Sequence, residues 1–71
     1  MALKKARLSE GFDLTGTEIS TLELLAAGKT PATIANLLGL KPASIRQRLK
    51  TIYEKAGVSG QVELVAFYNA L

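Results

Sequence analysis

The short connection between two segments in the middle of the chain restricts the fold more than any other feature. The segments "PATIANLL" (31–38) and "PASIRQRLKTIYEKA" (42–56) show apolar residues at helical spacing, and each begins with a proline. Proline suits the first position of a helix, where its missing N–H costs nothing. Only "GLK" separates the two segments. A connection this short, which contains Gly39, predicts two helices that cross steeply in a helix-turn-helix.

Two further helices are predicted on either side of this pair. Thr15 is followed three residues later by Glu18, which is the pattern of a capping box and predicts a helix over 16–27. The apolar segment at the end of the chain predicts a last helix that starts after Ser59 or Gly60. No strand pattern appears, so the expected fold is an all-α domain of four helices.

The residues before this domain show no sustained apolar period. We therefore expect an N-terminal arm over 1–13, with at most a short helix around Leu3 to Leu8, and one domain over 14–71. A chain of 71 residues has room for a single domain.

Composition excludes several classes of function. The chain has no Cys and no His, so disulfides and thiolate metal sites are impossible and general acid–base catalysis is disfavoured. Its carboxylates are scattered and it has no glycine-rich phosphate loop. We expect no enzymatic activity, no metal and no cofactor. No apolar run approaches the about 20 residues that a membrane span needs, so we expect no membrane association and a cytoplasmic location.

Positive charge is concentrated in the middle of the chain. The net charge is +3, yet residues 29–55 contain six Lys and Arg against one acid, Glu54. If the apolar positions of the helix over 42–56 face the core, a polar stripe faces outward. Arg and Lys pair with guanine edges, Gln pairs with adenine, and a small Ala lets the helix sit deep in the DNA major groove. The candidates for base contacts are Ala43, Ser44, Arg46, Gln47 and Lys50.

Phosphate contacts are predicted beside this stripe. Backbone N–H groups at helix N-termini favour phosphates, which selects residues at the starts of the second and third helices, and one further cation flanks the stripe. These candidates are Thr30, Thr33, Lys41 and Arg48. For each basic side chain alone, a solvated helix face is an equal alternative. The stripe and the turn together favour double-stranded DNA as the partner.

The last helix has almost no polar face. Glu63 and Asn69 are nearly its only polar residues, whereas a surface helix needs only one apolar stripe. Exposed apolar surface usually marks an interface, so we expect a two-fold homodimer through this helix. The candidate interface residues are Val62, Val65, Tyr68, Asn69 and Leu71. The alternative is that the N-terminal arm covers this surface.

Several motifs together resemble the LuxR/GerE (NarL/FixJ) type of helix-turn-helix DNA-binding domain, in a stand-alone form. They are "LT" before Glu18, "LELLAAG", "TPATIANLLGL", "SIR" and "IYEKAGV", within residues 14–71. The resemblance implies a third helix that reads operator DNA, a fourth that dimerises, and control of transcription. It also implies that Ser44, Arg46, Gln47 and Arg48 lie at DNA-contacting positions and that Lys55 contacts the DNA backbone.

The chain departs from the family pattern at several positions. Thr17 stands where the family usually has Arg, and Lys41 stands where it has a small hydroxyl cap. Arg48, Ala56 and Gln61 replace a common His, Leu and Arg, respectively.

Two other functions fit parts of the sequence. The apolar last helix would let a small antagonist pair with a larger LuxR-type regulator and block it from DNA. A module like region four of a sigma factor also contains a helix-turn-helix, and it would contact RNA polymerase.

Overall fold

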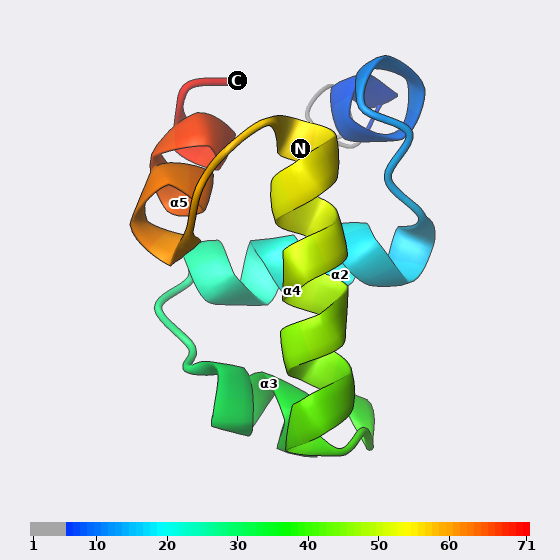
Figure 1. The fold of residues 1–71 in the computed structure, drawn as a ribbon, viewed down its shortest axis with the longest axis vertical. Helices are drawn as coiled ribbons and strands as arrows, with labels where there is room; N and C mark the ends of the chain where they lie inside the picture. The colour runs from blue at the N-terminus through cyan, green and yellow to red at the C-terminus, as the bar shows by residue number, and fades with distance from the viewer. Residues whose placement is uncertain (1–5) are drawn as a thin grey trace.

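The computed structural model describes residues 6–71, which fold into a series of helices (Figure 1). Within these residues there is no strand, which confirms the all-α fold. The element order is η1 (Arg7–Gly11), α2 (Gly16–Ala26), α3 (Pro31–Leu38), α4 (Pro42–Ala56) and α5 (Gln61–Asn69). The last four agree closely with the four predicted helices, and η1 is an additional turn.

Side chains near the helix starts fix the positions of α2 and α3. The Thr15 hydroxyl accepts a hydrogen bond from the Glu18 backbone N–H at 3.2 Å, and the Glu18 carboxylate accepts one from the Thr15 N–H at 2.9 Å. The predicted capping box is therefore present. At the start of α3, the Thr30 hydroxyl accepts a hydrogen bond from the Thr33 N–H at 3.2 Å. These bonds satisfy backbone donors that a helix start leaves free.

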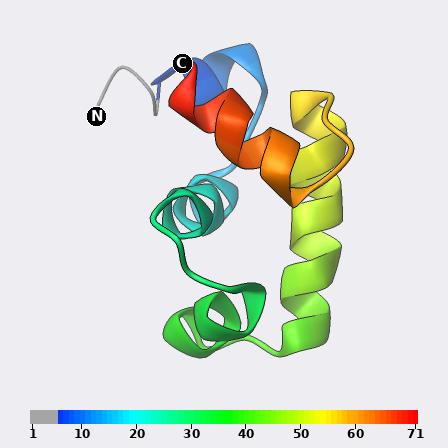
Figure 2. The same ribbon diagram turned by 90° about the vertical axis from the view of Figure 1, so that its left-hand side faces the viewer.

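The turn between α3 and α4 has the predicted form. Gly39 ends α3 with φ of +68°, a left-handed conformation that glycine adopts without steric cost. Lys41 precedes α4 and makes no side-chain cap, as its replacement of a hydroxyl residue implies. Figures 1 and 2 show α4 crossing α3 steeply at this end of the molecule.

One hydrophobic core joins all the elements. Residues from each helix are less than a tenth exposed and pack together, and α5 contacts both α2 and α4. α4 supplies three of these residues at the helical spacing that the sequence pattern predicted. The core consists of Leu8, Leu14, Ile19, Leu22, Leu25, Ile34, Ala35, Ile45, Leu49, Ile52 and Leu64.

The turn η1 is the main difference from the sequence-based expectation. A short helix was expected around Leu3 to Leu8. Residues 3–5 lie outside the described residues, and the helical turn begins only at Arg7. Leu8 is fully buried, and its carbonyl accepts a hydrogen bond from the Leu14 N–H at 3.0 Å. The segment before α2 therefore contributes to the core.

Candidate nucleic-acid interface

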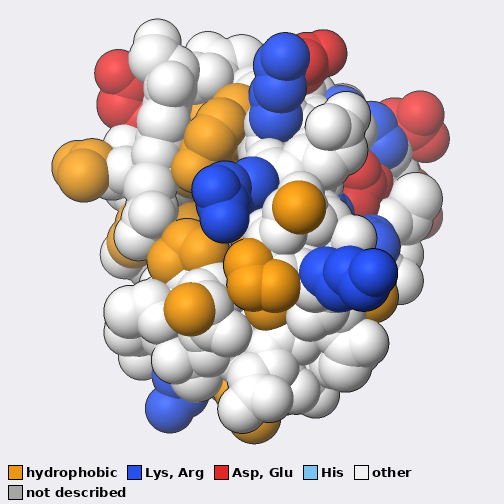
Figure 3. Space-filling model, turned by 60° about the horizontal axis from the view of Figure 1, so that its bottom comes forward, with side chains coloured by type: hydrophobic (Ala, Val, Ile, Leu, Met, Phe, Trp, Pro, Cys, Tyr) orange, Lys and Arg blue, Asp and Glu red, His pale blue; other side chains and the backbone are white. Residues whose placement is uncertain are grey.

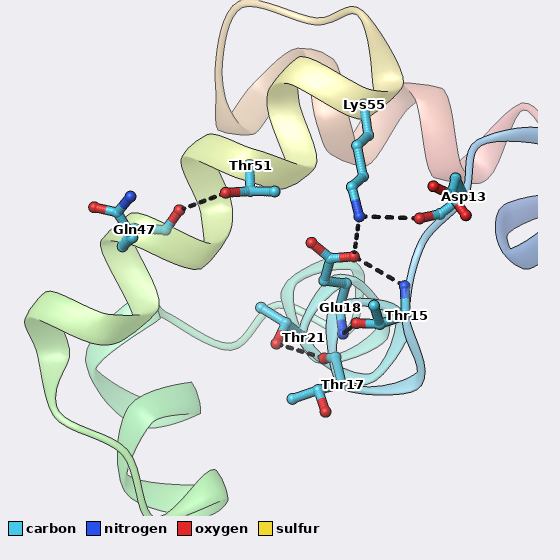
Figure 4. Close-up of polar contacts among 8 residues, drawn as sticks. All are labelled: Asp13, Thr15, Thr17, Glu18, Thr21, Gln47, Thr51 and Lys55. Carbon is cyan, nitrogen blue, oxygen red and sulfur yellow. Dashed lines mark hydrogen bonds and ion pairs between the residues drawn. The ribbon is translucent and has the colours of Figure 1, made fainter.

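The N-terminal half of α4 presents the predicted polar stripe to solvent. Ile45 and Ile52 are fully buried and Leu49 is 4% exposed, so the opposite side of the helix faces outward. Every residue proposed for base contacts is exposed: Ala43, Ser44, Arg46, Gln47 and Lys50. Figure 4 shows the Gln47 side chain pointing away from the other helices. The apolar spacing of α4 thus determines which side chains are available to a partner.

The phosphate candidates at the start of α3 and α4 are also accessible. Thr30, Thr33 and Lys41 are exposed. The hydroxyl of Thr30 donates to that of Thr33 at 3.0 Å and also accepts the cap bond from the Thr33 N–H. Both hydroxyls therefore hold the start of α3 in place, and their contact with phosphate stays a prediction.

Basic side chains are spread over this end of the molecule. Figure 3 views the end that carries the α3–α4 turn, with Lys and Arg side chains across the middle of the face among apolar and uncharged ones. The acidic side chains visible in this view gather toward its upper margin. A surface of this kind attracts a polyanion.

A groove lies between α2 and α4 beside the stripe. The groove is open to solvent, has a volume of about 510 Å³, and is lined by Glu18, Ala43, Ser44, Gln47, Arg48 and Thr51. Arg48 is half-buried, and its Nε atom is fully buried without a hydrogen-bond partner among the described residues. Arg48 is only half-buried and lines the groove, so its positive charge can attract an anion that enters the groove.

Lys55 lies at the other end of α4 and has partners within the chain. Its ammonium lies 2.8 Å from the Glu18 carboxylate and donates to the Asp13 carbonyl oxygen at 2.9 Å (Figure 4). An ammonium has three N–H donors, so these contacts occupy two of them. A phosphate contact by Lys55 stays a prediction. Sequence reasoning did not find the pair, because the two residues lie 37 positions apart.

The environment of Glu18 stabilises its ionised form. Burial acts to raise the pKa of this carboxyl, but the hydrogen bonds from Lys55 and the Thr15 N–H and the charge of Lys55 together lower the pKa below its usual value. The unfolded chain therefore takes up this proton at a higher pH than the folded protein does. The resulting stabilisation is complete above the unfolded value, about 4.3, and is lost as the pH falls through the folded value.

Acid unfolding should reveal this stabilisation. We expect the free energy of unfolding of the wild type to fall more steeply below about pH 4.3 than that of Glu18→Gln. A glutamine side chain still completes the capping box, so the variant isolates the charge. Urea titrations from pH 3 to 7 would measure the difference. Parallel pH profiles for the two proteins would contradict it.

The proposed interface residues, which lie on α5 and at Leu71 beyond its end, divide into two groups. Val62 is 84% exposed and Asn69 is exposed, whereas Val65, Tyr68 and Leu71 are half-buried. Part of the apolar surface of α5 is covered within the chain. The Phe12 and Phe67 rings meet edge to face with centroids 4.9 Å apart, and the C-terminal residue lines a groove with residues 6, 7 and 10–12. Among the described residues, no side chain covers Val62.

Within residues 6–71, no cluster of acidic residues could hold a metal ion. No helix in this part of the chain is long and apolar enough to cross a bilayer.

The turn, the crossed helices and the exposed basic stripe define a helix-turn-helix domain of the DNA-binding kind. The family model described as bacterial regulatory proteins, luxR family, matches residues 13–68. The chain therefore belongs to the luxR family, a family of DNA-binding helix-turn-helix regulators. Comparison with curated proteins and with solved structures gave no significant match.

Proposed function

We propose that the protein is a sequence-specific DNA-binding transcriptional regulator that acts as a homodimer and inserts α4 into the major groove. The observation that carries the proposal is the arrangement of α4. Its apolar side is buried, while all the base-contact candidates lie exposed on the other side. The proposed partner is DNA, which in bacteria lies in the cytoplasm, so we propose a cytoplasmic location for the protein.

The exposed stripe has the chemistry that base recognition needs. Arg46 carries a planar fork of donors that fits the O6 and N7 acceptors of guanine, and the Gln47 amide can pair with adenine. Ala43 adds little bulk at the start of α4, which allows close approach to the DNA. Lys41 and Arg48 flank the stripe and supply charge for phosphates, which position the protein without reading sequence.

The open side of α5 supports the homodimer. Val62 and Asn69 are seven residues apart and therefore lie on the same side of the helix, with Ala66 exposed between them. Small residues allow two helices to approach closely. A two-fold axis through this side would pair the α5 helices of two subunits and direct two α4 helices toward successive major grooves, about 34–36 Å apart.

Alanine in place of Arg46 or Gln47 tests base recognition. Each substitution should weaken binding to the preferred site by about 1–3 kcal/mol, because each removes a base contact. The site can be selected from random oligonucleotides, and gel-shift titrations with this site and a scrambled site would measure the loss.

Arg46→Lys is the matched control, because it keeps the charge and loses the planar fork. It should bind the scrambled site like the wild type and the selected site more weakly. An equal loss on both sites for the alanine variants would make these residues phosphate contacts instead.

The antagonist function is the second candidate, and the exposure of Val62 on α5 is the observation that favours it. A small partner could use this surface to pair with a larger regulator. Retention of the pure protein on immobilised DNA separates the two functions, because an antagonist without DNA affinity would elute at low salt.

A further inference from the structure

The groove between α2 and α4 is lined by side chains of opposite charge. Among residues 6–71, Glu18 is the only carboxylate that lines the groove, and Arg48 is the only cation that does so. The two residues therefore face the same space. Yet the Glu18 carboxylate pairs with Lys55 at 2.8 Å, and the Nε atom of Arg48 has no hydrogen-bond partner among the described residues.

The Arg48 guanidinium is available to another anion only if Glu18 pairs with Lys55 and not with Arg48. A carboxylate and a guanidinium form strong, often bidentate hydrogen bonds, so an unpaired Glu18 would attract Arg48 across the groove. Glu18 is 5% exposed, and a poorly solvated charge without a partner is costly. Lys55 supplies the compensating charge from the last turn of α4, and the Thr15 N–H donates to the same carboxylate oxygen.

We propose that Lys55 is a positioning residue for DNA binding: by neutralising Glu18, it leaves the Arg48 guanidinium available for a DNA phosphate in the groove. This inference rests on the proposed DNA-binding function and extends it. Lys55 acts through Glu18 and Arg48 and not as the phosphate ligand. Its side chain is 28% exposed, and its ammonium is already directed at Glu18 and the Asp13 carbonyl.

The inference predicts that the effect of Lys55 on DNA binding depends on both other side chains. Lys55→Gln should weaken binding to the selected site by about tenfold, the scale expected for one lost charge-assisted contact. In a Glu18→Gln background the same substitution should cost less than about twofold, because no carboxylate remains to capture Arg48. In an Arg48→Ala background its cost should also be less than about twofold, because the contact is already lost.

The test measures DNA affinity by fluorescence anisotropy for the wild type, the three single variants, and the double variants Glu18→Gln/Lys55→Gln and Arg48→Ala/Lys55→Gln. Thermal unfolding of each protein, with binding measured well below the lowest midpoint, separates affinity from stability. Lys55→Arg is the conservative control and should bind like the wild type, because it can still pair with Glu18.

Rescue of Lys55→Gln by Glu18→Gln would support the inference. An equal loss in all three backgrounds would overturn it and make Lys55 a direct phosphate contact, while the proposed function would stand. A wild-type protein that binds neither selected nor scrambled DNA would overturn the proposed function and the inference together.

Discussion

A glutamate at position 62 should convert the homodimer into a monomer and reduce operator binding by at least about 100-fold. Val62 is 84% exposed, so the monomer can accommodate the change without loss of its core. In a two-fold dimer, the substitution would place two new negative charges near each other in an apolar contact, which costs several kcal/mol. A monomer also loses the gain of about 10²–10⁴ that comes from binding two half-sites at once. Sedimentation velocity would measure the mass, and gel-shift titration the affinity.

Gln61→Glu provides the matched control for this experiment. It adds the same charge at the neighbouring exposed position of α5, which points in a different direction around the helix. The control should remain dimeric. An unchanged mass for Val62→Glu, or a wild type that sediments as a monomer at micromolar concentration, would show that α5 does not form the proposed interface.

Alanine in place of Leu8 should lower the free energy of unfolding by about 2–5 kcal/mol, the usual cost of removing a large apolar side chain from a core. The Leu8 side chain is fully buried, although the sequence indicates an arm at this position. Urea denaturation would measure the loss. Ser9→Ala, at the exposed neighbouring position, should change stability by less than about 0.5 kcal/mol. Equal stability of the two variants would show that residues 1–13 are an arm outside the folded domain, as the sequence predicted.

The sequence predicted the helices well where local chemistry determines their ends. Thr15 and Thr30 accept cap bonds from residues three positions away, and Gly39 and Gly57 adopt left-handed conformations that few other residues tolerate. Such signals need no knowledge of the rest of the fold. The same holds for the outward stripe of α4, because helical spacing alone separates its buried side from its exposed side.

Features that depend on distant contacts could not be predicted in this way. The pairing of Lys55 with Glu18 brings together residues 37 positions apart, and such a contact cannot be predicted from the spacing of apolar residues in the sequence. Leu8 lies in a polar segment without a repeating apolar pattern, so the sequence did not predict that its side chain is buried. The surface of α5 is apolar on nearly all sides, so spacing could not show that Phe12 covers Phe67 and that Val62 stays open.

The continuity of α4 has a consequence for the spacing of target sequences. Its 15 residues form one uninterrupted helix of about 22 Å, which packs against α2, α3 and α5 and whose first turns carry the polar stripe. In a dimer joined through α5, the packing of α5 against α2 and α4 would hold the subunit contact in place relative to the reading end. The separation and helical phase of the two half-sites would then be set by the protein, and an added base pair between them would be met by twisting and bending of the DNA rather than by adjustment of the protein.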